Sequence, residues 1–159
     1  MLTAGAKAPG FTLTDLSGNA HSLEEILERG PVLLAIYKIS CPTCQLTIPF
    51  LDRMAHAPHP GHSGLQIVGV SQDDERGTRR FLQAYSLTMP MLLDREEDGY
   101  PASNGFGLTH VPALFLVETD GSISLATNGF VKRDLEAIGR RAGVEPFHAE
   151  DHVPEWKAG

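Results

Sequence analysis

Two cysteines, Cys41 and Cys44, are the residues whose type and spacing point most directly to chemistry. They are the only cysteines of the chain, and they enclose Pro42 and Thr43 in a Cys-x-x-Cys sequence. The pair follows the apolar run Val32–Ile39 and opens a stretch with helical periodicity, so a buried strand is expected to deliver it to a helix start. There, unpaired backbone N–H groups and the helix dipole favour a nucleophilic thiolate on Cys41. Cys44 is close enough to close a reversible disulfide.

A cysteine pair can also bind metal or brace a fold, but both roles fit this sequence less well. A structural zinc site needs four ligands, usually from two such clusters, and the chain has no second Cys-x-x-Cys. A structural disulfide framework normally contains four or more cysteines in a short secreted chain. A pair of buried thiols without a chemical role remains open, but the pattern favours redox chemistry.

The composition indicates one ordinary globular domain. The chain has 159 residues, 42% of them hydrophobic and 21% charged, with a formal net charge of −7. That charge and the lack of a dense Lys/Arg run argue against a nucleic-acid partner. Residues 1–7 contain no long apolar stretch, so neither a signal peptide nor a membrane span is supported and a cytoplasmic location is expected. No Gly-rich dinucleotide or phosphate-binding motif appears, so no organic cofactor is expected.

Periodicity and turn residues predict strands and helices that alternate along the chain. Strands are expected at Phe11–Leu16, Val32–Ile39, Leu65–Ser71, Met91–Leu93, Val111–Val117 and Ser122–Thr127, and helices at Leu23–Arg29, from Cys41 onwards with a kink at Pro49, from Asp73 or Asp74 through Tyr85, and at Lys132–Ala142. This order describes an α/β protein, with a mixed central sheet and helices on both faces. Residues 1–143 form the expected domain, and the polar tail 144–159 is a candidate for poor order.

Three segments in the same order carry a family resemblance. Ala8–Leu13 resembles an N-terminal A-P-x-F-x-L sequence. Cys41–Cys44 follows a buried strand, and Pro49 falls where the family kinks its active-site helix. His110–Val117, with Asp120–Gly121 behind it, resembles G-V-P-x-x-F-L-I-D-x-x-G. The chain therefore resembles the thioredoxin superfamily, and within it the TlpA-like thiol–disulfide oxidoreductases and the related alkyl hydroperoxide reductase/thiol-specific antioxidant group.

The resemblance implies a fold, a groove and a reaction. The fold would be thioredoxin-like with an N-terminal β extension, and the Val111–Pro112 peptide would be cis and would face the disulfide. Pro112 would shape a groove for an extended substrate, supported by Pro42 and Thr43. Cys41 would attack a disulfide in a protein or small molecule, and Cys44 would release the product. A thiol partner would supply or accept the electrons.

The sequence also departs from the family pattern around the motif. Ser40 stands where Trp often precedes the first cysteine, Thr47 where an acidic residue is common, and Ala35 roughly where thioredoxin has a buried Asp. The carboxylate that helps to move the second thiol's proton is therefore not visible. His110, two residues before Pro112, is a candidate for tuning the thiolate. A surface or structural histidine is the alternative interpretation of that residue.

A peroxiredoxin-like peroxidase is the second enzymatic interpretation. That family places Thr or Ser three residues before its peroxidatic cysteine and Pro four residues earlier. Counting back from Cys44 gives Cys41 and Tyr37, and counting back from Cys41 gives Lys38 and Leu34. Neither frame fits, so a hydroperoxide is the less favoured substrate.

Two non-enzymatic interpretations also follow from residue types. The cysteine pair with His110 would suit Cu(I) in a copper-handling protein, although copper-delivering relatives usually space their cysteines more widely. A redox-regulated binding module without turnover is the other. His56, His59 and His62 recur every third residue, but the prolines between them break any helix that would align them. We therefore expect an exposed loop there and no metal site.

Overall fold

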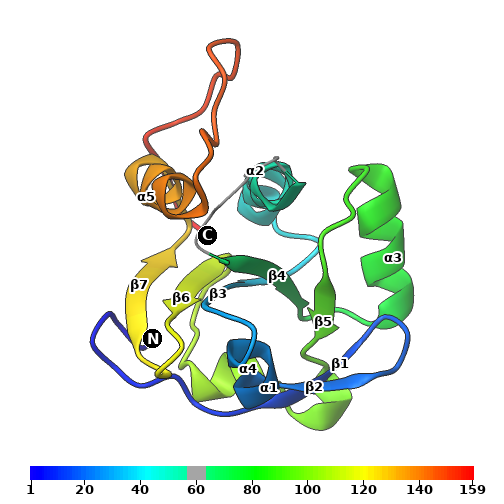
Figure 1. Ribbon diagram of the computed structural model, residues 1–159. Coiled ribbons are helices and arrows are strands. Elements are labelled where there is room, and N and C mark those ends of the chain that lie inside the picture. Colours follow the sequence, from blue (N-terminus) through cyan, green and yellow to red (C-terminus); the bar gives the residue numbers. More distant parts are fainter. Residues whose placement is uncertain (57–63) are drawn as a thin grey trace.

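The computed structural model describes residues 1–56 and 64–159 and shows a seven-stranded sheet between helices (Figure 1). The strands of this sheet are β1 (Thr12–Asp15), β2 (Ala20–Ser22), β3 (Val32–Tyr37), β4 (Gln66–Ser71), β5 (Met91–Leu93), β6 (Ala113–Val117) and β7 (Ile123–Asn128). The helices are α1 (Leu23–Leu27), α2 (Pro42–His56), α3 (Glu75–Ala84), α4 (Pro101–Gly105) and α5 (Lys132–Ala142), with a 3-10 turn η1 (Glu96–Asp98).

The sheet is mixed, and its order is β2-β1-β5-β4-β3-β6-β7. Strands β3, β4 and β5 run parallel, whereas β6 and β7 on one side and β1 and β2 on the other join in antiparallel pairs. Helices separate the parallel strands, because parallel neighbours need a crossover connection. The α/β class and the mixed sheet predicted from the sequence are confirmed.

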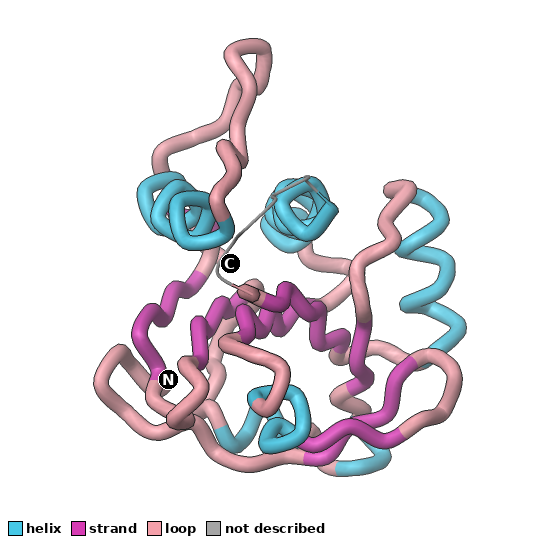
Figure 2. The backbone as a smooth tube through the Cα atoms, in the orientation of Figure 1, coloured by secondary structure: helices cyan, strands magenta, loops and turns pink. Residues whose placement is uncertain are grey.

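Strand β3 divides the interior into two apolar clusters. All six of its residues are buried, and they alternate between the two faces of the sheet. Val32, Leu34 and Ile36 join the cluster beneath α1 and α4, and the other three residues join the cluster beneath α2 and α5. The tube view shows the same layers, with helices above and below the strands (Figure 2). This double burial explains the almost continuous apolar run in the sequence.

Local capping fixes where several helices begin and end. The Ser22 side chain accepts the N–H of Glu25 at the start of α1, and Asp74 accepts the N–H of Gly77 at the start of α3. Gly143 ends α5 in the left-handed region, with φ of 78°. Pro49 lies inside α2, which continues to His56, and the kink expected there from the sequence stays a prediction.

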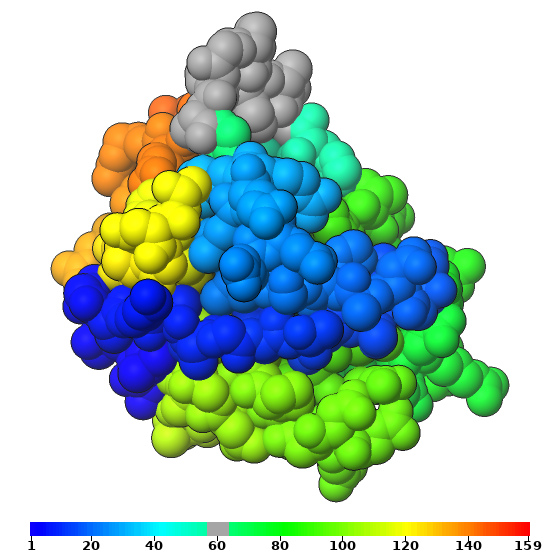
Figure 3. Space-filling view, turned by 60° about the horizontal axis from the view of Figure 1, so that its bottom comes forward, coloured from blue at the N-terminus to red at the C-terminus, as the bar shows by residue number. Residues whose placement is uncertain are grey.

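The N-terminal segment closes the face opposite to α2. In the space-filling view it forms a band across that face, beside α1 (Figure 3). The Leu2 N–H donates to Phe106 O at 2.9 Å, and the Ala8 N–H donates to Gly121 O at 2.8 Å. In the described ranges, no helix has both the length and the apolar character needed to cross a membrane.

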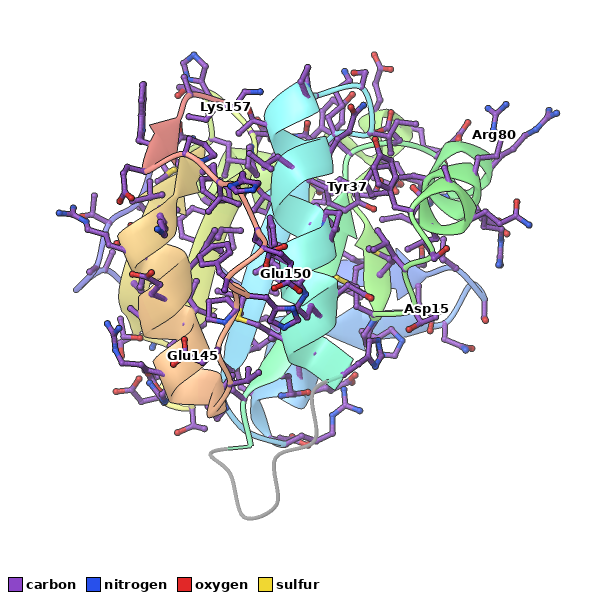
Figure 4. The ribbon with its side chains drawn as sticks, turned by 90° about the horizontal axis from the view of Figure 1, so that it is seen from above. Asp15, Tyr37, Arg80, Glu145, Glu150 and Lys157 are labelled. Carbon is purple, nitrogen blue, oxygen red and sulfur yellow. The ribbon has the colours of Figure 1, made fainter. Side chains whose placement is uncertain are left out.

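The tail after α5 returns to the domain. It runs beside α5 and α2 from Glu145 to Lys157 (Figure 4). Near its end, β9 (Trp156–Lys157) pairs antiparallel with β8 (Phe130–Val131), the short strand before α5. The structure thus places one short strand in the tail, and the poor order expected from its sequence stays a prediction.

Candidate active site

Cys41 is the residue just before α2, and it caps that helix. Its carbonyl accepts the first helical N–H, from Gln45, at 3.0 Å. Its sulfur accepts the backbone N–H of Cys44 at 3.2 Å, as a capping side chain would. Pro42 is the first helical residue, where a missing N–H costs little. The predicted setting of Cys41, a half-exposed sulfur at a helix N-terminus, is therefore present.

Two side chains that sequence reasoning missed hold the loop before Cys41. The Ile39 N–H donates to Asp73 Oδ2 at 2.8 Å, and the Gln45 side-chain amide donates to Ile39 O at 2.9 Å. Asp73 reaches this loop because β3 and β4 are parallel and Tyr37 is registered with Ser71. Two residues beyond each strand end, Ile39 and Asp73 meet. The sequence does show an Asp just after the carboxyl end of a strand. Its partner Ile39 can be identified only once the pairing register of β3 and β4 is known.

Cys44 is the protected member of the pair. Its side chain is 0% exposed and packs in the cluster beneath α2. Burial raises the pKa of the Cys44 thiol well above its ordinary value, and the neighbouring Cys41 sulfur and the negative charge of Asp73 act in the same direction. Both cysteines are free thiols. The site thus presents one accessible sulfur and keeps a second, protonated one behind it.

The segment before β6 forms the wall opposite Cys41. The Val111–Pro112 peptide bond is cis, which confirms the expectation drawn from the resemblance. The Cys41 thiol donates to Val111 O at 3.5 Å, and Pro112 is buried. Backbone groups of Val111 therefore lie at the sulfur, where an extended chain could pair with them.

Thr43 and His110 occupy different surroundings. Thr43 is only 3% exposed, and its hydroxyl donates to Ala158 O in the tail at 2.6 Å. The His110 side chain is exposed, and its Nδ1 lies 3.0 Å from the hydroxyl of Thr109. Asn128 holds the backbone of His110 through a bond to His110 O at 3.1 Å. An influence of His110 on the thiolate stays a prediction.

Metal-ligating groups do not converge in the described residues. Within 1–56 and 64–159, no three His, Cys, Asp or Glu side chains form a group that could hold an ion. His110 therefore does not complete a copper site with the two cysteines in this arrangement. Of the three spaced histidines, His59 and His62 lie outside the described residues. His56 Nε2 lies 2.7 Å from the Thr88 hydroxyl and 3.5 Å from Asp52 Oδ1.

Comparison with known proteins identifies the family. The AhpC/TSA family matches residues 4–126, which include the cysteine pair and the cis proline. The chain belongs to the AhpC/TSA family. This membership agrees with the resemblance drawn from the three sequence segments.

Similar proteins carry related names. Over 137 residues the chain is 26% identical to the thiol-disulfide oxidoreductase ResA of Geobacillus kaustophilus, covering 85% of this chain and 75% of that protein. The thioredoxin domain of a thiol-disulfide oxidoreductase from Bacteroides vulgatus superposes with a TM-score of 0.73 at 24% identity, covering 87% of this chain and 96% of that one. The peroxidoxin BcpB of Mycobacterium tuberculosis superposes with a TM-score of 0.72 at 20% identity, covering 90% and 96%.

The two structural likenesses establish the thioredoxin-like fold. Together with the family and the free cysteine pair, the similarity to thiol-disulfide oxidoreductases assigns this AhpC/TSA protein to the oxidoreductases of thiol–disulfide chemistry. The predicted activity class is thereby confirmed.

Proposed function

We propose that this protein exchanges electrons with disulfides through two thiols of unequal role, Cys41 as the attacking group and Cys44 as the resolving group. The observation that carries the assignment is the contrast between the half-exposed Cys41 sulfur at the helix start and the buried Cys44 sulfur behind it. Only the first can meet a substrate without movement of the core. Disulfide-containing polypeptides are the proposed substrates, because the cis proline and the backbone of Val111 border the sulfur.

The chemistry proceeds by two thiol–disulfide exchanges. The Cys41 thiolate attacks one sulfur of the substrate disulfide, that S–S bond breaks, and the released substrate thiolate takes up a proton. Cys44 then loses its proton and attacks Cys41, which frees the second substrate thiol and leaves a Cys41–Cys44 disulfide. Two electrons and two protons pass from the dithiol to the substrate. A thiol partner restores the dithiol by the reverse exchange.

Dithiothreitol-driven reduction of insulin tests the assigned roles. Wild type should accelerate insulin reduction, and Cys41→Ser should abolish the acceleration. Without dithiothreitol, pre-reduced Cys44→Ser should still attack insulin, and it should accumulate a mixed disulfide that mass spectrometry detects on Cys41. Accumulation of the mixed disulfide on Cys44 in Cys41→Ser would reverse the roles. Fast consumption of hydroperoxide without insulin reduction would instead establish the peroxidase alternative.

We also propose that the protein is cytoplasmic, as its sequence leads us to expect. Fractionation of native cells with an antibody against this protein would test it. Recovery in a membrane or extracytoplasmic fraction would reject it.

A further inference from the structure

The tail beyond α5 is anchored along α2 by two kinds of contact. The Phe147 ring packs edge-on against Phe50 of α2, with ring centroids 4.9 Å apart, and lies 6.0 Å from the ring of Phe130. The Arg53 guanidinium of α2 donates to Asp151 Oδ2 at 2.7 Å and to Pro146 O at 3.1 Å. These anchors direct the chain back towards the N-terminal end of α2, where the cysteines lie (Figure 4).

Residues 155–159 then lie beside the cysteine pair, and Trp156 and Lys157 among them form the strand β9. The Lys132 N–H donates to Glu155 O at 3.0 Å, and Trp156 and Lys157 are registered with Val131 and Phe130 in the β8–β9 pair. Gly129, at the start of this contact, has φ of 79°, and a Cβ there would come within 2.5 Å of Lys157 O. The approach of the two backbones is therefore close.

The strand ends against the residues that form the groove. Ala158 O accepts the hydroxyl of Thr43, one of the two residues between the cysteines. Gly159 lies so close to Val111 that a Cβ on Gly159 would overlap Val111 O. Val111 O is also the group that accepts the Cys41 thiol. The tail thus contacts both the cysteine-bearing helix and the cis-proline wall.

We propose that residues 155–159 are an intramolecular competitor for the substrate groove, so that a polypeptide disulfide must displace this strand before it reaches Cys41. The proposal rests on the assigned role of Cys41. Recognition of an extended chain by added backbone pairing uses the same groups whatever chain supplies the strand. The tail already takes up the Thr43 hydroxyl and lies against Val111 O, so a substrate strand that approaches these groups would overlap it.

Competition of this kind discriminates between substrates by size. The Cys41 sulfur stays half-exposed while the tail is in place, so a small disulfide can reach it. A polypeptide needs the groove as well as the sulfur. Its apparent affinity is reduced by the fraction of molecules with an open groove, so a tail that is docked in about 90% of molecules weakens polypeptide binding about tenfold.

Gly159→Val in the full chain tests the proposal, because the added side chain would collide with Val111 O and expel the strand end. Gly10→Val is the matched control, since a Cβ at Gly10 meets no atom within 4 Å. Two rates are compared: insulin reduction and the reaction of Cys41 with 5,5′-dithiobis(2-nitrobenzoic acid). Gly159→Val should raise kcat/KM for insulin at least threefold and change the small-disulfide rate less than twofold. Gly10→Val should change neither rate.

A second variant guards against an unexpected local adjustment at Gly159. Lys157→Pro removes a backbone N–H from β9, which weakens its pairing with β8 and should give the same selective gain. Unchanged insulin kinetics in both folded variants would overturn the proposal while the assigned role of Cys41 stands. An equal gain with both substrates would also overturn it, because general exposure would then be the cause. Failure of wild type with either kind of disulfide would instead reject the proposed function itself.

Trp156 offers an independent measurement, since it is the only tryptophan of the chain. Cys44→Ser is allowed to form a mixed disulfide with a tryptophan-free peptide, which holds the peptide in the groove. Displacement of β9 should lower the Trp156 fluorescence anisotropy relative to the free variant. Unchanged anisotropy would show that tail and peptide occupy the groove together, and it would overturn the proposal.

Discussion

The cysteine-bearing loop and the C-terminal tail meet beside Cys41, but they are held in different ways. On the cysteine side, the backbone of Ile39 is held at both its N–H and its carbonyl, and Cys44 anchors the helix in the core. On the tail side, residues 155–159 are all exposed. They are held by the two-residue strand β9, by a backbone bond and an ion pair from Lys132 to Glu155, and by the Thr43 hydroxyl. The firmly held cysteine side is therefore suited to position the reacting sulfur, and the weakly held tail is suited to dissociate.

The difference also separates two kinds of perturbation. Damage to the cysteine side changes the position of Cys41, and therefore slows exchange with every disulfide. Release of the tail changes only access to the groove, and therefore speeds exchange with polypeptides alone. The sign of the effect and its dependence on substrate size distinguish the two sides.

The largest effect should come from Asp73→Ala, which removes the acceptor for the Ile39 N–H and frees the loop before Cys41. Exchange should slow about tenfold with insulin and small disulfides alike, since a misplaced reacting group is costly. Asp73→Asn keeps an oxygen acceptor and should restore most of the rate. Asp74→Ala is the matched control, because Asp74 caps α3 without touching Ile39. Wild-type rates in Asp73→Ala would show that Ile39 needs no such support.

Alkaline pH should weaken the cysteine side more than the tail side. Burial raises the pKa of Cys44 and of Tyr37, so the folded state keeps both protonated while the unfolded state ionises. The stability that each group contributes is complete below its ordinary pKa, about 8.5 for a thiol and about 10 for a tyrosine. It is lost as pH rises above that value, at most ~1.4 kcal/mol per pH unit for each group, so between pH 8 and 10 the loss comes from Cys44. Urea unfolding of the reduced protein between pH 8 and 10 should show the loss, and Cys44→Ala should reduce its slope. Equal slopes of unfolding free energy against pH in wild type and Cys44→Ala would show that the Cys44 thiol does not contribute to the loss.

The smallest effect is expected from His110→Ala, at the rim where the two sides meet. An exposed imidazole is screened by water and salt, so alkylation of Cys41 at pH 6–7 should slow only about twofold. Iodoacetamide labelling of wild type and variant measures this directly, and Thr109→Ala is a control for the neighbouring contact. Superimposable labelling rates would make His110 a bystander.

Residues near one another in the chain account for most of what the sequence predicts here. Four features depend on local pattern: the continuous apolar run of β3, the cap at Ser22, the end of α5 at Gly143 and the Cys-x-x-Cys at a helix start. The cis peptide before Pro112 came from family resemblance. Each of these features is fixed by a few neighbouring residues, so a single sequence contains the signal.

The sequence does not predict contacts that depend on strand register or on where a distant segment packs. Asp73 meets Ile39 only because β3 and β4 pair in one particular register. The tail is polar and lacks periodicity, and the two ring contacts of Phe147 can be expected only once Phe50 and Phe130 are placed side by side. Such contacts join residues far apart in the chain. The composition of residues 144–159 alone therefore predicts poor order, and it contains no signal for these contacts.

The position of Gly159 beside Val111 also affects how this protein is handled in the laboratory. Any purification tag joined to Gly159 would begin against Val111 O, the group that accepts the Cys41 thiol. A tag at Met1 would begin near Gly107, whose Cβ position lies 3.5 Å from Met1. The two tagged forms would therefore differ in the contacts of the tail at Cys41. Measurements of tail release need a cleavable tag at Met1.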